Sequence, residues 1–483
     1  MSWKETAEPV LTRMPSVRRP KGHVPFRRKL GWTVGVLVLY FFLTNVALYG
    51  LRTGASGEVF GQFRSILAGG AGTILQVGIG PIVTASIVLQ LLGGADLLGL
   101  DTSDPRDQIL YQGLQKFLVI VMTVLTALPM VFAGGFLRAD RQLATALGIG
   151  TFGVNWLIFA QVFVGGILIL FMDEVISKWG VGSGIGLFIV AGVSQQLIGG
   201  LFNLPSILGG QARGFFPAWY SIATGQTPAS PETLVFGDGQ LLALATTLLI
   251  FAIVVYAESV RVEIPLSHAR VKGARGRFPV KLIYASVLPM ILVRALQANV
   301  QFLGRILAGE MGDSMPNWLG VYTSGSGGRQ PTGGLFYYLN PIQRPQDWIG
   351  TTQPAWEVAL RVGTDLTIMV IGGAIFAIFW VETADMGPES TAQQIQNSGM
   401  QIPGFRQNPG VIEKVLERYI PQVTVIGGAL VGLLAVGANM LGTIGSVTGT
   451  GLLLTVSITY KLYEEIAEEQ LMEMHPVMRQ MFG

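Results

Sequence analysis

The stretch Gly78-Ile-Gly-Pro-Ile-Val-Thr-Ala-Ser-Ile-Val-Leu-Gln-Leu-Leu92 contains no charged residue and forms most of an apolar segment, residues 73–92. A bilayer core about 30 Å thick needs roughly 20 mainly apolar residues per helix, because every backbone polar group must be satisfied within the segment. The segment has that length, so we expect it to span a membrane. The stretch therefore predicts an all-α membrane protein.

The composition of the whole chain agrees with this prediction. Of the 483 residues, 50% are hydrophobic and only 13% are charged, and the mean hydropathy is +0.52. A soluble domain has about 25% charged residues, so a soluble enzyme is disfavoured. Glycine is abundant, with 64 residues, and predicts helices that pack closely. Cysteine is absent, which excludes disulfides, thiolate metal sites and cysteine nucleophiles.

Ten apolar stretches are candidates for membrane spans: 30–49, 73–92, 117–136, 155–171, 184–202, 241–257, 282–302, 366–381, 420–440 and 443–460. They divide the chain into an arm (1–29), a first half (30–203), an external segment (204–240), a second half (241–461) and a tail (462–483). Two halves of five spans each must be oppositely oriented, which is the inverted arrangement of many transporters and channels.

Basic residues predict which ends of the spans are cytoplasmic. The arm has eight Lys and Arg residues against two Glu, so the positive-inside rule places it in the cytoplasm. Ten spans then put both termini there. The loops after spans six and eight are also basic, as this topology requires. The loop after span two, with four Asp and one Arg, gives no support, although acidic residues count little in the rule.

A short apolar segment, residues 59–67 (VFGQFRSIL), is too short to cross a bilayer and is followed by Gly69, Gly70 and Gly72. It could re-enter the membrane, which is tolerated only inside protein or beside a water-filled cavity. It could equally be an external amphipathic connector. The residues alone leave both possibilities open.

Residues for catalysis, metal binding or nucleotide binding are not evident. The three histidines, His23, His268 and His475, lie outside the spans and have no second His at ligand spacing. The chain has no GxxxxGK[ST] motif, so we expect no cofactor, no metal and no enzyme activity. Arg294 is the only ionisable residue near the middle of a span, with Asp365 and Glu382 at the ends of span eight.

Several motifs resemble one family over essentially the whole chain. Residues 78–92 are similar to the span-two signature of the SecY family, the pore subunit of the Sec protein-translocation channel. The further matches follow in the family's order: 173–189 (DEVISKWGVGSGIGLFI), 256–268 (YAESVRVEIPLSH), 379–383 (FWVET) and 449–457 (GTGLLLTVS). The sequences of these motifs are closer to those of archaeal and eukaryotic members than to those of bacterial ones.

The resemblance implies a channel of two pseudo-symmetric halves that passes unfolded secretory chains and releases hydrophobic segments sideways into the bilayer. It favours the re-entrant alternative, with a plug that includes Val59, Phe60, Phe63, Ile66 and Leu67. It also implies a pore ring formed by Ile79, Val83, Ile185, Ile189, Ile291 and Leu454. An aliphatic ring hinders ions and offers no fixed hydrogen bonds, so any polypeptide sequence could slide past it.

A lateral gate is implied between spans two and three on one side and spans seven and eight on the other. Its polar residues map to Thr84, Thr126 and Asn299, although ordinary interhelical contacts would also explain Thr126. Arg294 departs from the family pattern. It follows Ile291 by three residues, so we expect it to face the pore or the gate.

The family's partners follow from the same resemblance. The ribosome would dock on two cytoplasmic loops that include Arg261, Arg270, Lys272, Arg275, Arg277 and Arg406. Positive-inside topology alone would also make these loops basic. Further partners are a SecE-like subunit and a beta subunit, each with one span, together with signal peptides and nascent secretory chains. The resemblance also implies that the protein lies in the cell membrane. The alternative from another class is a secondary transporter of small solutes built from inverted repeats.

Overall fold

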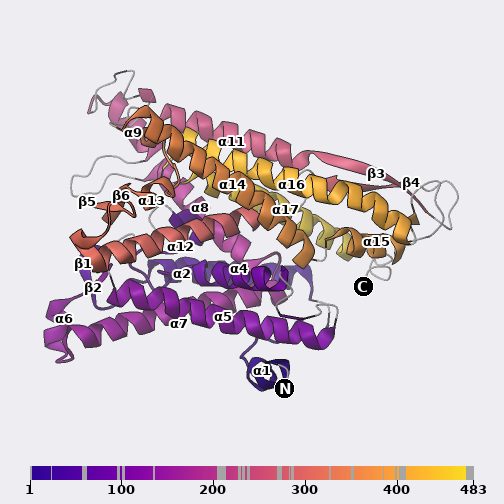
Figure 1. Ribbon diagram of the computed structural model, residues 1–483, viewed down its shortest axis with the longest axis horizontal. Coiled ribbons are helices and arrows are strands. Elements are labelled where there is room, and N and C mark those ends of the chain that lie inside the picture. Colours follow the sequence, from indigo (N-terminus) through magenta and orange to yellow (C-terminus); the bar gives the residue numbers. More distant parts are fainter. Residues whose placement is uncertain are drawn as a thin grey trace.

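The computed structural model describes residues 3–22, 24–56, 63–94, 98–100, 104–133, 136–203, 214–226, 230, 234–235, 240–268, 275–281, 283, 288–325, 328–349, 353–384, 386–397, 400–401, 409–445 and 447–474. Long helices dominate this part of the chain (Figure 1). Short strands and most of the short helices lie at the two ends of the helical bundle.

Each of the ten predicted spans overlaps one long helix. In chain order these are α2 (Phe26–Asn45), α4 (Gly80–Gly94), α5 (Pro105–Phe132), α7 (Gly150–Trp179), α8 (Gly184–Phe202), α11 (Leu241–Ser259), α12 (Leu288–Met311), α14 (Ala355–Thr383), α16 (Pro409–Leu441) and α17 (Gly449–Met474). Among the described residues, six helices are long and apolar enough to cross a membrane, namely α5, α7, α8, α11, α14 and α16, and α4 is a shorter apolar helix.

Glycine and proline explain where the helix boundaries differ from the prediction. The second span is predicted to begin at residue 73, but α4 begins at Gly80, Thr73 forms an isolated β-bridge with Ala47, and residues 74–79 form turns. Gly78 has a left-handed backbone, with φ of +60°, and Pro81 is tolerated only in the first turn of a helix. The prediction that Asp365 ends span eight was wrong, because α14 begins after Pro354 and places Asp365 inside the helix.

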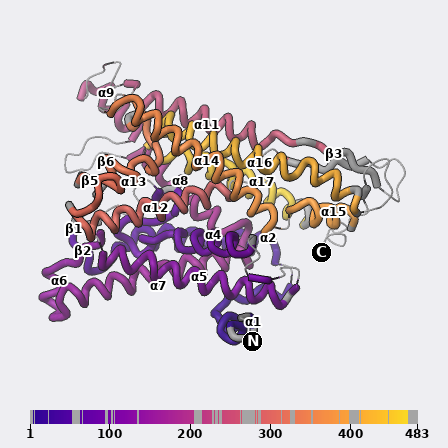
Figure 2. Tube along the Cα trace, viewed as in Figure 1, coloured from indigo at the N-terminus to yellow at the C-terminus, as the bar shows by residue number. Residues whose placement is uncertain are grey.

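The two halves of the chain form two layers (Figure 1). Most helices of the first half, coloured indigo to magenta, lie on one side, and most of those of the second half, coloured pink through orange to yellow, lie on the other. The tube in Figure 2 shows that α1 (Trp3–Leu11), near the N-terminus, and the C-terminal end of α17 lie at the same end of the bundle. This common end is what an even number of crossings requires.

Small antiparallel sheets occur at both ends of the bundle. At the end away from the termini, β1 (Leu51–Ser56) pairs with β2 (Leu137–Ala139), and β5 (Val321–Gly325) pairs with β6 (Gly328–Gly333). The short helices at this end are α6 (Arg141–Ala146), α9 (Phe215–Ala223) and α13 (Leu335–Tyr338). At the end near the termini are β3 (Arg261–His268), β4 (Arg275–Lys281), β7 (Met400–Gln401) and α15 (Pro388–Asn397).

Glycines allow α14 and α16 to pack at backbone contact. A Cβ atom on Gly373 would lie 2.6 Å from the carbonyl oxygen of Gly428, and one on Gly432 would lie 2.3 Å from that of Met369. Helices in lipid associate through such close contacts, because water supplies no driving force there. The prediction that the abundant glycine serves helix packing is confirmed at this interface.

Candidate functional site

The six residues assigned to the pore ring come from four helices that converge on one hydrophobic core. Ile79 and Val83 lie at the start of α4, Ile185 and Ile189 on α8, Ile291 on α12 and Leu454 on α17. Five of them are buried, and Ile185 is partly buried against the same core. The Ile79 carbonyl accepts the Val83 amide at 3.1 Å, so the i, i+4 spacing holds although Ile79 precedes the helix. Helices of both halves thus contribute aliphatic side chains to this core.

A short helix, α3 (Arg64–Leu67), lies where the plug is predicted and packs against α8, α12 and α17. Phe63, Ile66 and Leu67 are each only 2% exposed and belong to the same hydrophobic core as the assigned ring. The other two plug residues, Val59 and Phe60, lie outside the described residues. The described part of the segment is therefore inside the bundle and is not an external connector.

Two hydrogen bonds hold the end of α3 in this position. The Leu67 carbonyl accepts the Ile79 amide at 2.8 Å, and the Ala68 carbonyl accepts the Tyr40 hydroxyl at 2.9 Å. Tyr40 also stacks on Phe188 of α8, with ring centroids 4.9 Å apart. Sequence reasoning missed Tyr40, although a tyrosine in a predicted span needs a partner for its hydroxyl, which is a usable signal.

Gly78 permits the close approach between α3 and the start of α4. A Cβ atom there would lie 2.1 Å from the Leu67 carbonyl oxygen, far inside contact distance. Its φ of +60° is also one that L residues rarely adopt. Both observations require glycine at this position.

The residues assigned to the lateral gate are only partly brought together. The Asn299 side-chain amide on α12 donates to the Thr84 hydroxyl on α4 at 3.0 Å, and Thr84 in turn donates to the Gly80 carbonyl at 2.9 Å. Thr126 donates to the Met122 carbonyl of its own helix, α5, at 2.8 Å. In the described part of the chain, no hydrogen bond links Thr126 to Thr84 or Asn299. A gating role for all three stays a prediction.

Arg294, unexplained by the sequence, forms a buried polar cluster between α12 and α14. Its side chain is 1% exposed, and its Nη1 donates to Asp365 Oδ1 at 3.1 Å and to Gln297 Oε1 at 2.7 Å. The Gln297 amide also donates to Asp365 Oδ1, at 3.2 Å. Both helices belong to the second half, so Arg294 joins neighbours within that half. Asp365 and Gln297 were missed as its partners.

The basic loops assigned to ribosome docking meet in one sheet. β3 pairs with β4 along its length, and β7 pairs with β3 through Ser267 and His268. The loop after α11 and the loop after α15 are therefore neighbours in space. Arg261 is exposed at the start of β3, and Arg275 and Arg277 are positions of β4. Arg270, Lys272 and Arg406 lie outside the described residues.

The arrangement as a whole is typical of a gated membrane channel. A helical bundle of two layers shares an aliphatic core, and a short helix tied by two hydrogen bonds occupies that core. Aliphatic groups cannot coordinate a small polar solute, but they suit a constriction through which varied chains pass.

Comparisons with known proteins identify the family. The SecY family model matches residues 73–463, and the model of the plug domain of Sec61p matches residues 38–72. The chain is 74% identical to the protein translocase subunit SecY of Haloarcula marismortui, over 100% of both chains. The chain belongs to the SecY family, as the sequence motifs predicted.

Two solved structures agree with this assignment. One, described as a protein conducting channel, is 37% identical in sequence and has a TM-score of 0.80. The match covers 97% of this chain and 98% of that chain. The other is Sec61 in the canine ribosome-channel complex from the endoplasmic reticulum. It is also 37% identical, with a TM-score of 0.77 and the same coverage of both chains.

Proposed function

We propose that this chain is the pore subunit of a channel that conducts unfolded secretory polypeptides across the cell membrane and releases hydrophobic segments sideways into the bilayer. The observation that carries the proposal is the position of α3. Its apolar residues lie in the core shared by α4, α8, α12 and α17, where the assigned pore ring also lies. Membership of the SecY family supports the same function.

Opening of the pore requires α3 to leave this core. Full burial of a side chain such as Phe63, Ile66 or Leu67 is worth about 1.5–3 kcal/mol. The two hydrogen bonds at Leu67 and Ala68 add to that cost. A resting channel is therefore closed, and a translocating segment that replaces the contacts of α3 compensates for its displacement.

Sideways release would take place between α4 and α12. One hydrogen bond, between Asn299 and Thr84, crosses this interface among the described residues. Such a bond in a membrane is worth about 0.6–2 kcal/mol. A hydrophobic segment that gains contacts with lipid can exceed this cost, so it can separate the two helices.

Partners and orientation complete the proposal. We infer that the ribosome docks on the β3–β4–β7 sheet and its adjoining loops, because this sheet joins the loop after α11 to the loop after α15 at the end near the termini. A cationic surface suits RNA phosphates through release of counterions. The similar canine Sec61 was solved in a ribosome-channel complex. A SecE-like and a beta subunit would complete a heterotrimer, with both termini in the cytoplasm.

The absence of native cysteine makes site-specific crosslinking a direct test. Ile189→Cys and Ile291→Cys variants, loaded with a secretory chain stalled by a folded domain, should each crosslink to that chain. Leu248→Cys on α11, where the side chain is 62% exposed, is the matched control and should not crosslink. Crosslinks at Leu248 equal to those at Ile189 and Ile291 would contradict the proposed path.

A further inference from the structure

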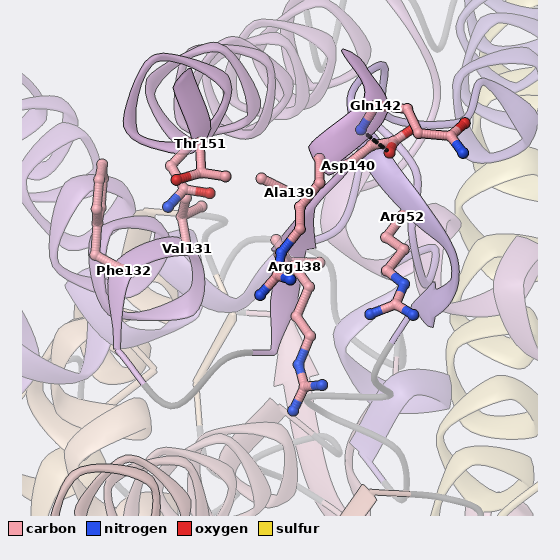
Figure 3. A pocket seen from close by; sticks show the side chains of 11 residues that line it. Arg52, Val131, Phe132, Arg138, Ala139, Asp140, Gln142 and Thr151 are labelled. Carbon is pink, nitrogen blue, oxygen red and sulfur yellow. Dashed lines mark hydrogen bonds between the residues drawn. The ribbon is translucent and has the colours of Figure 1, made fainter. Parts of the chain in front are cut away.

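A cavity of about 720 Å³ lies at the end of the molecule away from the termini. The β1–β2 ladder, the start of α6 and the adjoining ends of α5 and α7 form its wall. Figure 3 shows side chains from these elements around one space, among them those of Arg52, Arg138 and Gln142. No role for this cavity follows from the pore, the plug or the gate.

The charged groups on the cavity wall favour an anion. Three arginines, Arg52, Arg138 and Arg141, line the cavity with one carboxylate, Asp140. Asp140 Oδ1 accepts a hydrogen bond from the Gln142 backbone N–H at 2.9 Å, so Asp140 caps the start of α6. The lining therefore has an excess of positive charge, and a bound anion would relieve the repulsion among the guanidinium groups. Arginine presents planar, paired donors that match phosphate oxygens.

The apolar side of the cavity continues onto a surface suited to lipid. Phe132 lines the cavity, and its ring centroid lies 5.2 Å from that of Trp156 and 6.0 Å from that of Phe152. Trp156 is 46% exposed and Phe152 is 67% exposed, both on the first turns of α7. Exposed aromatic residues at the end of a membrane helix are typical of the zone between lipid headgroups and hydrocarbon. A ligand held by the arginines would thus extend along this aromatic surface.

We propose that this cavity binds the anionic phosphodiester headgroup of a membrane lipid. The arginines contact the phosphate, and the hydrocarbon chains lie on Phe152 and Trp156. The site is independent of the translocation pathway, since none of its lining residues is assigned to the pore, plug or gate.

Local fluorescence quenching can test the site. Leu147→Cys carries a small fluorophore just after α6, roughly 10 Å from Asp140 by the rise of the helix. The protein is placed in phosphatidylcholine vesicles that contain increasing amounts of phosphatidylglycerol with a nitroxide near the headgroup. Phosphatidylcholine with the same nitroxide is the reference. We expect half-quenching at an about fivefold lower fraction of the anionic lipid, the preference that one arginine near a membrane provides.

A matched pair of variants locates the effect. Arg52→Gln, Arg138→Gln and Arg141→Gln together should reduce the preference to about one. Arg13→Gln, Arg18→Gln and Arg19→Gln remove the same charge from exposed positions at the other end of the molecule and should leave it unchanged. Single Arg52→Gln and Arg141→Gln variants, each with a partial loss, separate the effect from misfolding of the triple variant. Equal preference in the triple variant and in the unmodified chain would overturn the proposal.

Two further outcomes distinguish the source of the phosphate. Excess inorganic phosphate should leave the quenching unchanged, because it lacks the hydrocarbon contacts. Trp156→Ser should weaken quenching by the anionic lipid. If inorganic phosphate abolishes the preference and Trp156→Ser does not alter it, the site binds a free anion and the lipid proposal is wrong.

Discussion

Helix α12 makes two interfaces of different character. Toward α14 it presents Arg294 and Gln297, which form a buried cluster with Asp365. Toward α4 it presents Asn299, which makes one neutral hydrogen bond to Thr84. These residues lie within two turns of one helix, so two very different contacts exist side by side.

The difference indicates which interface can open. Separation of α12 from α14 would leave a buried guanidinium and a buried carboxylate without each other, which costs about 3–5 kcal/mol in proteins. Separation of α12 from α4 breaks a bond worth about 0.6–2 kcal/mol. We therefore expect α12 and α14 to move as one unit and the channel to open between α12 and α4.

The largest effect is expected at the α12–α14 interface. Arg294→Met leaves Asp365 buried and unpaired, so the free energy of unfolding should fall by about 3–5 kcal/mol. Arg294→Met with Asp365→Leu should recover most of that loss, because no charge is then buried. Unfolding by denaturant in detergent measures both variants. If the double variant is as unstable as the single one, the pair does not act as a charge pair.

A smaller, local effect is expected where the end of α3 contacts the residues just before α4. Gly78→Ala places a methyl group against the Leu67 carbonyl and should displace α3, which raises the ion conductance of the resting channel in planar bilayers. Gly148→Ala is the matched control, since Gly148 has a similar φ of +67° and no atom near its Cβ position. Each change costs about 1–2 kcal/mol of backbone strain. Equal conductance in the two variants would show that the contact with Leu67 does not seal the pore.

The sequence predicted the helices more fully than the contacts between them. Among the described residues, each predicted span overlaps a helix, because the apolar residues that suit a segment to lipid lie within that segment. Some helix starts differ from the prediction. α4 begins late, after Gly78 with its left-handed backbone, and α14 begins early, directly after Pro354. Thr84 and Asn299, which the resemblance assigns to the gate, lie 215 positions apart in the chain and are joined by a hydrogen bond.

Other contacts between distant residues have no local sequence pattern from which they could be predicted. The partner of Arg294 is 71 positions away, and no periodicity connects the two residues. The sequence placed Asp365 at one end of span eight and did not indicate it as the partner of Arg294. The same limit applies to the sheet formed by β3, β4 and β7, because β-pairing between distant loops depends on the packing of the helices that carry them.

Two engineered disulfides compare the two interfaces directly in this cysteine-free chain. Val293→Cys with Gly372→Cys links α12 to α14, where the Cβ position of Gly372 lies 3.8 Å from that of Val293, a distance typical of disulfides. Thr84→Cys with Asn299→Cys links α4 to α12. We predict that membrane insertion of a hydrophobic segment continues with the first disulfide, stops with the second, and returns on reduction. Continued insertion with α4 and α12 linked, or its loss with α12 and α14 linked, would contradict opening between α4 and α12.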